Sequence, residues 1–290
     1  MRALGPARRG NGPIERHHED AAAAFQRTLE ERVLSMSRVL RARTGARNIL
    51  IAGGIALNSV MNGRLVRESG FEDLYVMAGA GDNGTSIGAA HYVEHGVLGR
   101  PRRSVHDHPY LGASYSNEAI LRALTAAGIT TARSTDVVRE TAERLAEGKI
   151  VAWLQGRMEV GPRALGARSI LANPTLPEMK ATLTLRVKHR EAFRPFAPSV
   201  TREKKSLYFE TSVDDPFMLK DCRVRPEHRE RLPAVTHVDG TARLQICRCL
   251  GSSWRTDRWI RARAPSTWCR RRSTSSSGSS TPSRIFGGST

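Results

Sequence analysis

The residues best suited to chemistry lie between Gly156 and Ser169, in the stretch GRMEVGPRALGARS, which holds three arginines, one glutamate and three glycines. Arginine binds phosphate and carboxylate oxygens through two parallel N–H groups, and glycine lets backbone N–H groups approach the same anion. A second cationic stretch, Val187 to Pro198, adds Lys188 and Arg194 beside a rigid FRPFAP segment. Two such stretches predict one site for a polyanionic ligand. The alternative is a loop whose arginines pair with Glu159 or face solvent.

Three further segments carry polar or glycine-rich patterns. Leu232 to Arg243 combines a candidate acid/base histidine, His237, with Asp239 and Arg243. A single histidine beside an aspartate is more often a local hydrogen-bonded pair. The glycine-rich stretches AGGIALN, residues 52–58, and AGAGDNG, residues 78–84, suit loops that pass close to a ligand. Without further context, the aspartate in DNG is equally well explained as a turn residue.

Hydrophobic periodicity predicts the elements that position these loops. A helix is expected over residues 19–43, with an inward stripe made of Ala22, Phe25, Leu29, Val33, Met36 and Leu40. Strand, helix and strand then follow at residues 48–52, 56–68 and 74–77, and a helix at residues 86–95. Residues 97–114 are expected to connect two domains. The second domain should contain helices at residues 117–127, 135–147 and 177–190 and a strand at residues 150–154.

The net charge of +18 raises nucleic acid as a partner, but much of this charge is concentrated at the end of the chain. Residues 246–290 hold nine arginines and one aspartate, without lysine or glutamate, and are rich in serine and tryptophan. This composition predicts a disordered tail. Cysteine spacing favours free thiols, and the absence of a long apolar run or a signal peptide favours a cytoplasmic protein that does not enter a membrane.

Taken together, these five segments resemble the carbamoyltransferase family that includes nodulation-factor and antibiotic-tailoring O-carbamoyltransferases. The resemblance covers residues 16–245, and the segments occur in the family's order. It implies an α/β fold in which the C-terminal lobe of an ASKHA (actin-like ATPase) domain, residues 1–110, precedes a YrdC-like domain, residues 113–245. Residues 246–290 form the predicted tail.

The resemblance also implies a two-step reaction. Carbamoyl phosphate and ATP give carbamoyl-adenylate with loss of pyrophosphate, and a hydroxyl group of a natural product then takes the carbamoyl group as AMP leaves. The residues carried over from the family are Arg163, Lys188, Arg194 and Arg243 for carbamoyl phosphate and nucleotide phosphates, Gly54 and Asn58 for the adenylate, and Asp82 for an active-site metal ion, iron or magnesium. His17, His18, His106 and His108 are expected to have structural or surface roles.

The chain departs from the family at both ends. We expect the first half of the ASKHA-like domain to be missing before Met1, and we interpret residues 246–290 as the product of a frameshift. Two other functions stay open: a protein of tRNA threonylcarbamoylation, which uses the same two folds, and a basic nucleic-acid-binding protein. The sequence says nothing about the acceptor or the oligomeric state.

Overall fold

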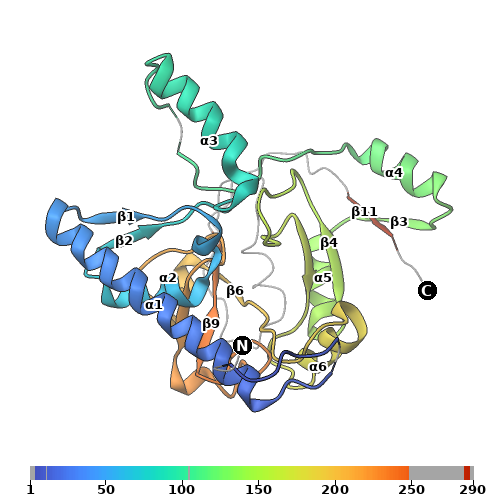
Figure 1. Ribbon diagram of the computed structural model, residues 1–290. Helices are drawn as coiled ribbons and strands as arrows, with labels where there is room; N and C mark the ends of the chain where they lie inside the picture. Colours follow the sequence, from blue (N-terminus) through green and yellow to red (C-terminus); the bar gives the residue numbers. More distant parts are fainter. Residues whose placement is uncertain (1–3, 11, 104, 248–283, 288–290) are drawn as a thin grey trace.

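The computed structural model describes residues 4–10, 12–103, 105–247 and 284–287, and it has a mixed α/β architecture with several small sheets (Figure 1). The N-terminal elements are α1 (Arg16–Thr44), β1 (Asn48–Leu50), the 3-10 helix η1 (Gly54–Leu57), α2 (Ser59–Glu68), β2 (Asp73–Tyr75), the 3-10 helix η2 (Asp82–Gly84), α3 (Thr85–His91) and the π-helix η3 (Tyr92–Val97). The two strands pair in parallel, with α2 in the connection between them, which confirms the predicted strand, helix and strand.

The long first helix starts and ends at recognisable caps. The backbone N–H of Glu15 donates to Nδ1 of His18 at 3.0 Å, so one donor at the helix start is satisfied. Gly45 ends the helix with a φ of 64°, and its N–H donates to the Arg41 carbonyl. The predicted helix is therefore confirmed, together with its glycine stop.

The predicted apolar stripe of α1 is confirmed in part: Leu29 and Val33 pack against the first core, but the other members of the stripe are exposed. Phe25, Met36 and Leu40 are exposed, at 64%, 71% and 48% of their surface. The buried positions of α1 are Glu30, Leu34 and Ser37. Hydrophobic spacing could not reveal this face, because Glu30 is satisfied by an ion pair with Arg64 of α2 and the Ser37 hydroxyl donates to the Leu34 carbonyl of its own helix.

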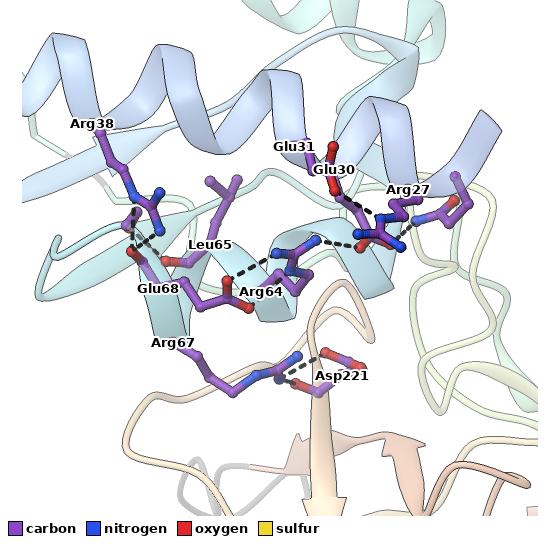
Figure 2. Close-up of polar contacts among 11 residues, drawn as sticks. Arg27, Glu30, Glu31, Arg38, Arg64, Leu65, Arg67, Glu68 and Asp221 are labelled. Carbon is purple, nitrogen blue, oxygen red and sulfur yellow. Dashed lines mark hydrogen bonds and ion pairs between the residues drawn. The ribbon is translucent and has the colours of Figure 1, made fainter. Parts of the chain in front are cut away.

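Helix α2 lies between α1 and the strand β8 (Asp221–Val224) and holds the first core together (Figure 2). On the α1 side, Arg64 donates to Glu30 of α1 at 2.9 Å, and it also donates to Glu68 of its own helix at 2.8 Å. On the other side, Arg67 pairs with the buried Asp221 at 3.0 Å. Met61 and Leu65 are almost fully buried between these contacts.

The first core draws on both predicted domains. Leu165, Phe217 and Leu219 pack with residues of α1, α2, β1 and β2 in one cluster. The buried Asn62 donates its side-chain amide to the carbonyls of Ala56 and Leu219, at 2.7 and 2.8 Å. The predicted boundary between two domains at residues 110–113 stays a prediction, because the segments before and after it share this core.

The second part of the chain contains α4 (Asn117–Ala126), β3 (Thr131–Ser134), α5 (Val137–Ala146), β4 (Val151–Leu154), β5 (Arg168–Leu171), α6 (Met179–Thr182), the π-helix η4 (Leu183–Lys188), β6 (Ser199–Thr201), the 3-10 helix η5 (Arg202–Lys204), α7 (Lys205–Tyr208), β7 (Phe209–Glu210), β8, the 3-10 helix η6 (Pro226–His228), β9 (Thr241–Arg243), β10 (Gln245–Cys247) and β11 (Arg284–Gly287). Strands β7, β8 and β9 form an antiparallel sheet, β4 pairs with β5, and β10 pairs in parallel with β6. The helix expected at residues 177–190 is divided between α6 and η4.

The predicted disordered tail is wrong at two places. Ile246 and Cys247 belong to β10, and Ile246 is buried in a second core with Val224 and Leu244. Arg284–Gly287 pairs antiparallel with β3. The rest of the predicted tail, residues 248–283 and 288–290, lies outside the described residues. None of the described helices combines the length and apolar character needed to cross a membrane.

Gly63 of α2 permits the close approach of α2 to β8. A Cβ atom at Gly63 would overlap Oδ1 of Asp221, whereas a Cβ at Gly88 of α3 would meet nothing within 4 Å. We expect Gly63→Ala to lower the free energy of unfolding by about 1–3 kcal/mol, because Asp221 and Arg67 must move. Gly88→Ala should raise it by about 0.5–1 kcal/mol, because alanine favours helix. Urea unfolding measures both, and equal stability of the two variants would contradict this packing.

Candidate anion site

Glu159 organises the arginine-containing loop that connects β4 to β5. Its side chain is fully buried, and Oε1 accepts the backbone N–H groups of Leu165, Ala167 and Arg168 at 2.7, 2.9 and 3.1 Å. Oε2 accepts from Nε of Arg168 at 3.2 Å. The alternative expected from the sequence, in which the loop arginines pair with Glu159, is therefore confirmed for Arg168. Arg163 projects elsewhere, from a loop whose backbone this carboxylate fixes.

This loop lies directly against the glycine-rich stretch 78–84. Gly161 has a φ of 102°, and a Cβ at this position would overlap the carbonyl oxygen of Ala78. A Cβ at Gly79 would lie 3.3 Å from Cγ1 of Val160. Residues 52–58 adjoin the stretch 78–84, because the N–H of Gly53 donates to the Ala80 carbonyl at 2.8 Å. Three segments that are far apart in the sequence thus meet at one place.

Arg163 connects the loop between β4 and β5 to the glycine-rich segment 52–58. One terminal nitrogen donates to the carbonyl of Leu57 at 3.1 Å. Leu57 belongs to the glycine-rich segment 52–58. Its Nε is buried and has no hydrogen-bond partner among the described residues. Burial lowers the pKa of Arg163, and Asp215 opposes this shift.

Arg243 and Arg190 join Arg163 in a partly buried cluster of positive charge. The Nε atoms of Arg243 and Arg190 are also buried without a partner in the described part of the chain. Burial, followed by the charges of Arg163 and Arg190, lowers the pKa of Arg243 to about 10. Arg190 lies over the ring of Phe196, with 4.5 Å from its guanidinium carbon to the ring centroid. Three neighbouring cations with unused donors are a candidate site for an anion.

Asp215 lies close enough to Arg163 and Arg243 to interact with their charges. The carboxylate is buried and accepts the backbone N–H groups of Phe217 and Lys220, at 3.1 and 2.6 Å. Burial raises the pKa of Asp215 to about 6, although the hydrogen bond from Lys220 opposes this. Asp215 therefore loses its proton, and gains its negative charge, as the pH rises through about 6.

His237 lies at the same place but is held by its neighbours. Nδ1 is 3.1 Å from Oγ1 of Thr241, and this hydroxyl donates to Asp239 at 2.7 Å. Burial lowers the pKa of His237, while Asp239 raises it and Arg243 lowers it. The expected local pair of His237 and Asp239 is thus bridged by Thr241, and His237 adds a second group that can gain positive charge in the cluster.

The other two predicted phosphate-binding cations are placed differently. Arg194 is exposed and pairs with Glu191 at 2.9 Å, although its charge lowers the pKa of the neighbouring Arg190. Lys188 is exposed at the end of the π-helix η4. The structure therefore brings together Arg163 and Arg243 and leaves Lys188 and Arg194 on the surface of the segment that carries Arg190.

The residues expected to contact nucleotide and metal have mixed surroundings. Gly54 is exposed, with nothing within 4 Å of a Cβ placed there. Asn58 caps α2 by accepting the N–H of Met61 at 3.1 Å, and its amide also pairs with Gln26. Asp82 is exposed in η2. Across the described residues, no three or more His, Cys, Asp or Glu side chains surround a point that could hold a metal ion.

Sequence reasoning named Arg190 only as part of a cationic stretch and did not single out Asp215. The signal for Arg190 was present, since it lies between Lys188 and Arg194 in the same stretch. Asp215 had no such signal, because its importance comes from burial next to distant arginines. Glu159 was noticed only as an alternative partner for arginine.

The fold is mixed α/β, and the cluster of Arg163, Arg190 and Arg243 is its candidate anion site. Comparison with known proteins then gives the family: the carbamoyltransferase N-terminus matches residues 7–91, and the carbamoyltransferase C-terminus matches residues 142–253. These two matches cover more than half of the chain. The chain belongs to the carbamoyltransferase family, a family of transferases.

Several curated relatives are similar over most of this chain. Nodulation protein NolO of Bradyrhizobium diazoefficiens is 40% identical over 257 residues, which is 83% of this chain and 46% of the relative. Nodulation protein NolNO of Sinorhizobium fredii is 42% identical over 248 residues, which is 82% of this chain and 36% of the relative. Uncharacterized protein sll1178 of Synechocystis is 38% identical over 268 residues, which is 83% and 44%, respectively. The chain spans less than half the length of these relatives.

The buried carboxylate of Glu159 yields a prediction about stability. Glu159→Gln replaces a charged acceptor with an amide that presents N–H groups to Arg168, so we expect a loss of about 1.5–3 kcal/mol in urea unfolding. Glu191→Gln is the matched control, because the same change breaks an exposed ion pair and should cost less than about 1 kcal/mol. Equal losses in the two variants would show that Glu159 does not organise the loop.

The raised pKa of Asp215 yields a prediction about pH. A raised folded-state pKa means that the stability contributed by the protonated form is present at low pH and lost as pH rises through about 6. Protonation also removes a negative charge beside the arginines. Sulfate should therefore raise the melting temperature more at pH 5.5 than at pH 7.5. The Arg163→Gln/Arg243→Gln double variant should lose this pH-dependent increment, and an undiminished increment would place sulfate elsewhere.

Proposed function

We propose that this chain carries the carbamoyl phosphate site of an ATP-dependent O-carbamoyltransferase. The observation that carries the proposal is the cluster of Arg163, Arg190 and Arg243, each with a buried Nε that has no partner among the described residues. Membership in the carbamoyltransferase family supports transfer of a carbamoyl group. The unused N–H groups of the arginines are the reason to place carbamoyl phosphate here. The acceptor in this proposal is a hydroxyl group of a natural product.

The arginines suit the charge of such a substrate. A guanidinium group with a pKa near 10 is still charged at neutral pH, so burial of Arg243 does not remove its positive charge. Partial exclusion of water strengthens its interaction with phosphoryl oxygens relative to that of an exposed arginine. Arg163, Arg190 and Arg243 would neutralise negative charge as the phosphate bond is broken. Lys188 and Arg194 would contribute if their segment moves toward the bound substrate.

We place ATP beside the glycine-rich segments 52–58 and 78–84. The open space next to Gly53 and Gly54 leaves their backbone accessible, and Arg163 reaches this segment through the Leu57 carbonyl. A nucleotide here would have its phosphates near the carbamoyl donor. Water would cleave carbamoyl phosphate to carbamate and inorganic phosphate, and the carbamate oxygen would then attack the α-phosphorus of ATP, giving carbamoyl-adenylate as pyrophosphate leaves. Contacts of Gly54 and Asn58 with the adenylate are part of this proposal.

The same proposal assigns the first part of the chain to an ASKHA-type lobe and the second to a YrdC-like domain. The parallel pair β1–β2 with its connecting α2 and the mixture of small sheets that follows are compatible with this assignment. Asp82 would supply one carboxylate to a divalent metal ion, iron or magnesium. No second ligand gathers beside it in the described residues, so no step is assigned to a metal.

Binding and chemistry can be tested separately. Carbamoyl phosphate should bind to the protein in calorimetry, and with ATP and carbamoyl phosphate the protein should release pyrophosphate. Arg163→Gln and Arg243→Gln should each weaken binding, and each should lower the rate of pyrophosphate release by about 100-fold, the loss typical of one preorganised donor. Arg122→Gln, in the exposed part of α4, is the matched control and should leave both measurements unchanged.

The outcomes separate two parts of the proposal. If carbamoyl phosphate binds equally well to wild type, Arg163→Gln and Arg243→Gln, the assignment of the arginine cluster is wrong. If binding depends on these arginines but no pyrophosphate forms, the carbamoyl phosphate site stands and the assignment of ATP to this chain is overturned.

A further inference from the structure

The three arginines of the candidate anion site are carried by three separate segments of the chain. Arg163 lies in the loop between β4 and β5, Arg190 follows the π-helix η4, and Arg243 is the last residue of β9. Guanidinium groups repel one another, so neighbouring arginines keep a fixed arrangement only where their backbones are held together. The contacts that join these three segments therefore determine the shape of the site.

Gln245 is a residue at which the three segments meet. It lies in β10, two residues after Arg243, and it is buried. Its backbone N–H donates to the carbonyl of Pro198 at 2.9 Å, next to the parallel pairing of β10 with β6. This bond joins the strand that follows Arg243 to the end of the segment that carries Arg190.

The side chain of Gln245 reaches the third segment. Nε2 donates to the carbonyl of Leu165, two residues after Arg163, at 2.8 Å. Oε1 accepts the hydroxyl proton of Ser199 at 2.8 Å. A carbonyl oxygen only accepts, so the amide nitrogen faces Leu165 and the amide oxygen is left for Ser199. One buried side chain and one backbone N–H thus connect all three arginine-carrying segments.

The backbone of Leu165 is a fixed point of the loop that carries Arg163. Its N–H donates to Glu159 at 2.7 Å, and its carbonyl also accepts from Oη of Tyr110 at 2.8 Å. The Leu165 side chain is almost fully buried in the first core. Glu159 holds the loop from within, and Tyr110 holds it to the segment before α4, whereas Gln245 holds it to β10.

The next residue of β10 extends this arrangement to the carboxylate near the arginines. The N–H of Ile246 donates to the backbone carbonyl of Asp215 at 2.8 Å. Asp215 interacts with the charges of Arg163 and Arg243. Strand β10 therefore holds the Arg163 loop with one residue and the segment of Asp215 with the next.

We propose that Gln245 is a positioning residue for the arginine cluster: its side chain holds Arg163 where this arginine shares a bound phosphate group with the other two. The inference rests on the proposed carbamoyl phosphate site. Gln245 itself does not touch the substrate, because its amide is occupied by Leu165 and Ser199. Misplacement of a binding group by about 1 Å can cost on the order of 100-fold in rate, so a hydrogen bond behind the site can control it.

Calorimetry with inorganic phosphate tests the position of Arg163 without ATP or turnover. Gln245→Met keeps the length of the side chain and removes both of its hydrogen bonds, and we expect it to weaken phosphate binding by about tenfold or more. Tyr110→Phe is the matched control. It removes the other hydrogen bond to the same Leu165 carbonyl but leaves the loop joined to β10, so its affinity should stay close to that of wild type. The comparison is made at a temperature at which circular dichroism shows all variants to be folded.

A positioning role also predicts that two substitutions are not additive. In an Arg163→Gln background no guanidinium group remains to be positioned, so Gln245→Met should cause no further loss of phosphate affinity. A residue that only stabilises the fold would instead lower the melting temperature and leave the affinity of the folded protein unchanged. An unchanged affinity in folded Gln245→Met, or an equal loss in the Arg163→Gln background, would overturn the proposal.

Hydrogen exchange separates this proposal from the proposed function. We expect faster exchange of backbone N–H groups at residues 163–168 in both Gln245→Met and Tyr110→Phe, but faster exchange at residues 199–201 only in Gln245→Met. If wild type binds no phosphate, the assignment of the anion site is wrong, and hydrogen exchange alone decides whether Gln245 joins the loop to β10 and β6. Equal exchange at residues 199–201 in wild type and Gln245→Met would then overturn the inference.

Discussion

The close contact of two loop backbones determines where everything else in the candidate site lies. The loop that carries Arg163 passes so close to the carbonyl of Ala78 that Gly161 has no room for a side chain, and it does so at a positive φ. Glu159 maintains this path by accepting three backbone N–H groups with one oxygen. Arg163 can therefore reach the Leu57 carbonyl, and the glycine-rich segments adjoin the arginine cluster.

The cluster itself illustrates how a protein prepares for an anionic substrate. Removing charged groups from water is unfavourable, which is why burial lowers the pKa values of Arg163, Arg190 and Arg243. Neighbouring cations add to this effect for Arg190 and Arg243. Asp215 offsets part of this cost, but its own burial raises its pKa, so its compensation is partial. The unused Nε donors and the uncompensated charge are the parts of the site that a bound phosphate group would satisfy.

Much of the local structure followed from the sequence. The long first helix, its glycine stop and the strand, helix and strand after it were predicted, because periodicity and capping are local properties. The orientation of α1 was predicted only in part, since Leu29 and Val33 pack against the core, whereas Glu30 and Ser37 are buried and Met36 is exposed. Strand β5 was not predicted, because it follows directly from an irregular loop whose hydrogen bonds come from one buried carboxylate.

The sequence by itself determined the family resemblance, the order of the cationic and glycine-rich segments, and the importance of Arg163 and Arg243. Residue type and spacing are sufficient for these conclusions. Only the tertiary structure decided that Arg190 joins those two arginines while Lys188 and Arg194 lie outside, and that Asp215 interacts with Arg163 and Arg243. Each of these depends on residues far apart in the chain becoming neighbours, which packing of the shared core determines and local pattern does not.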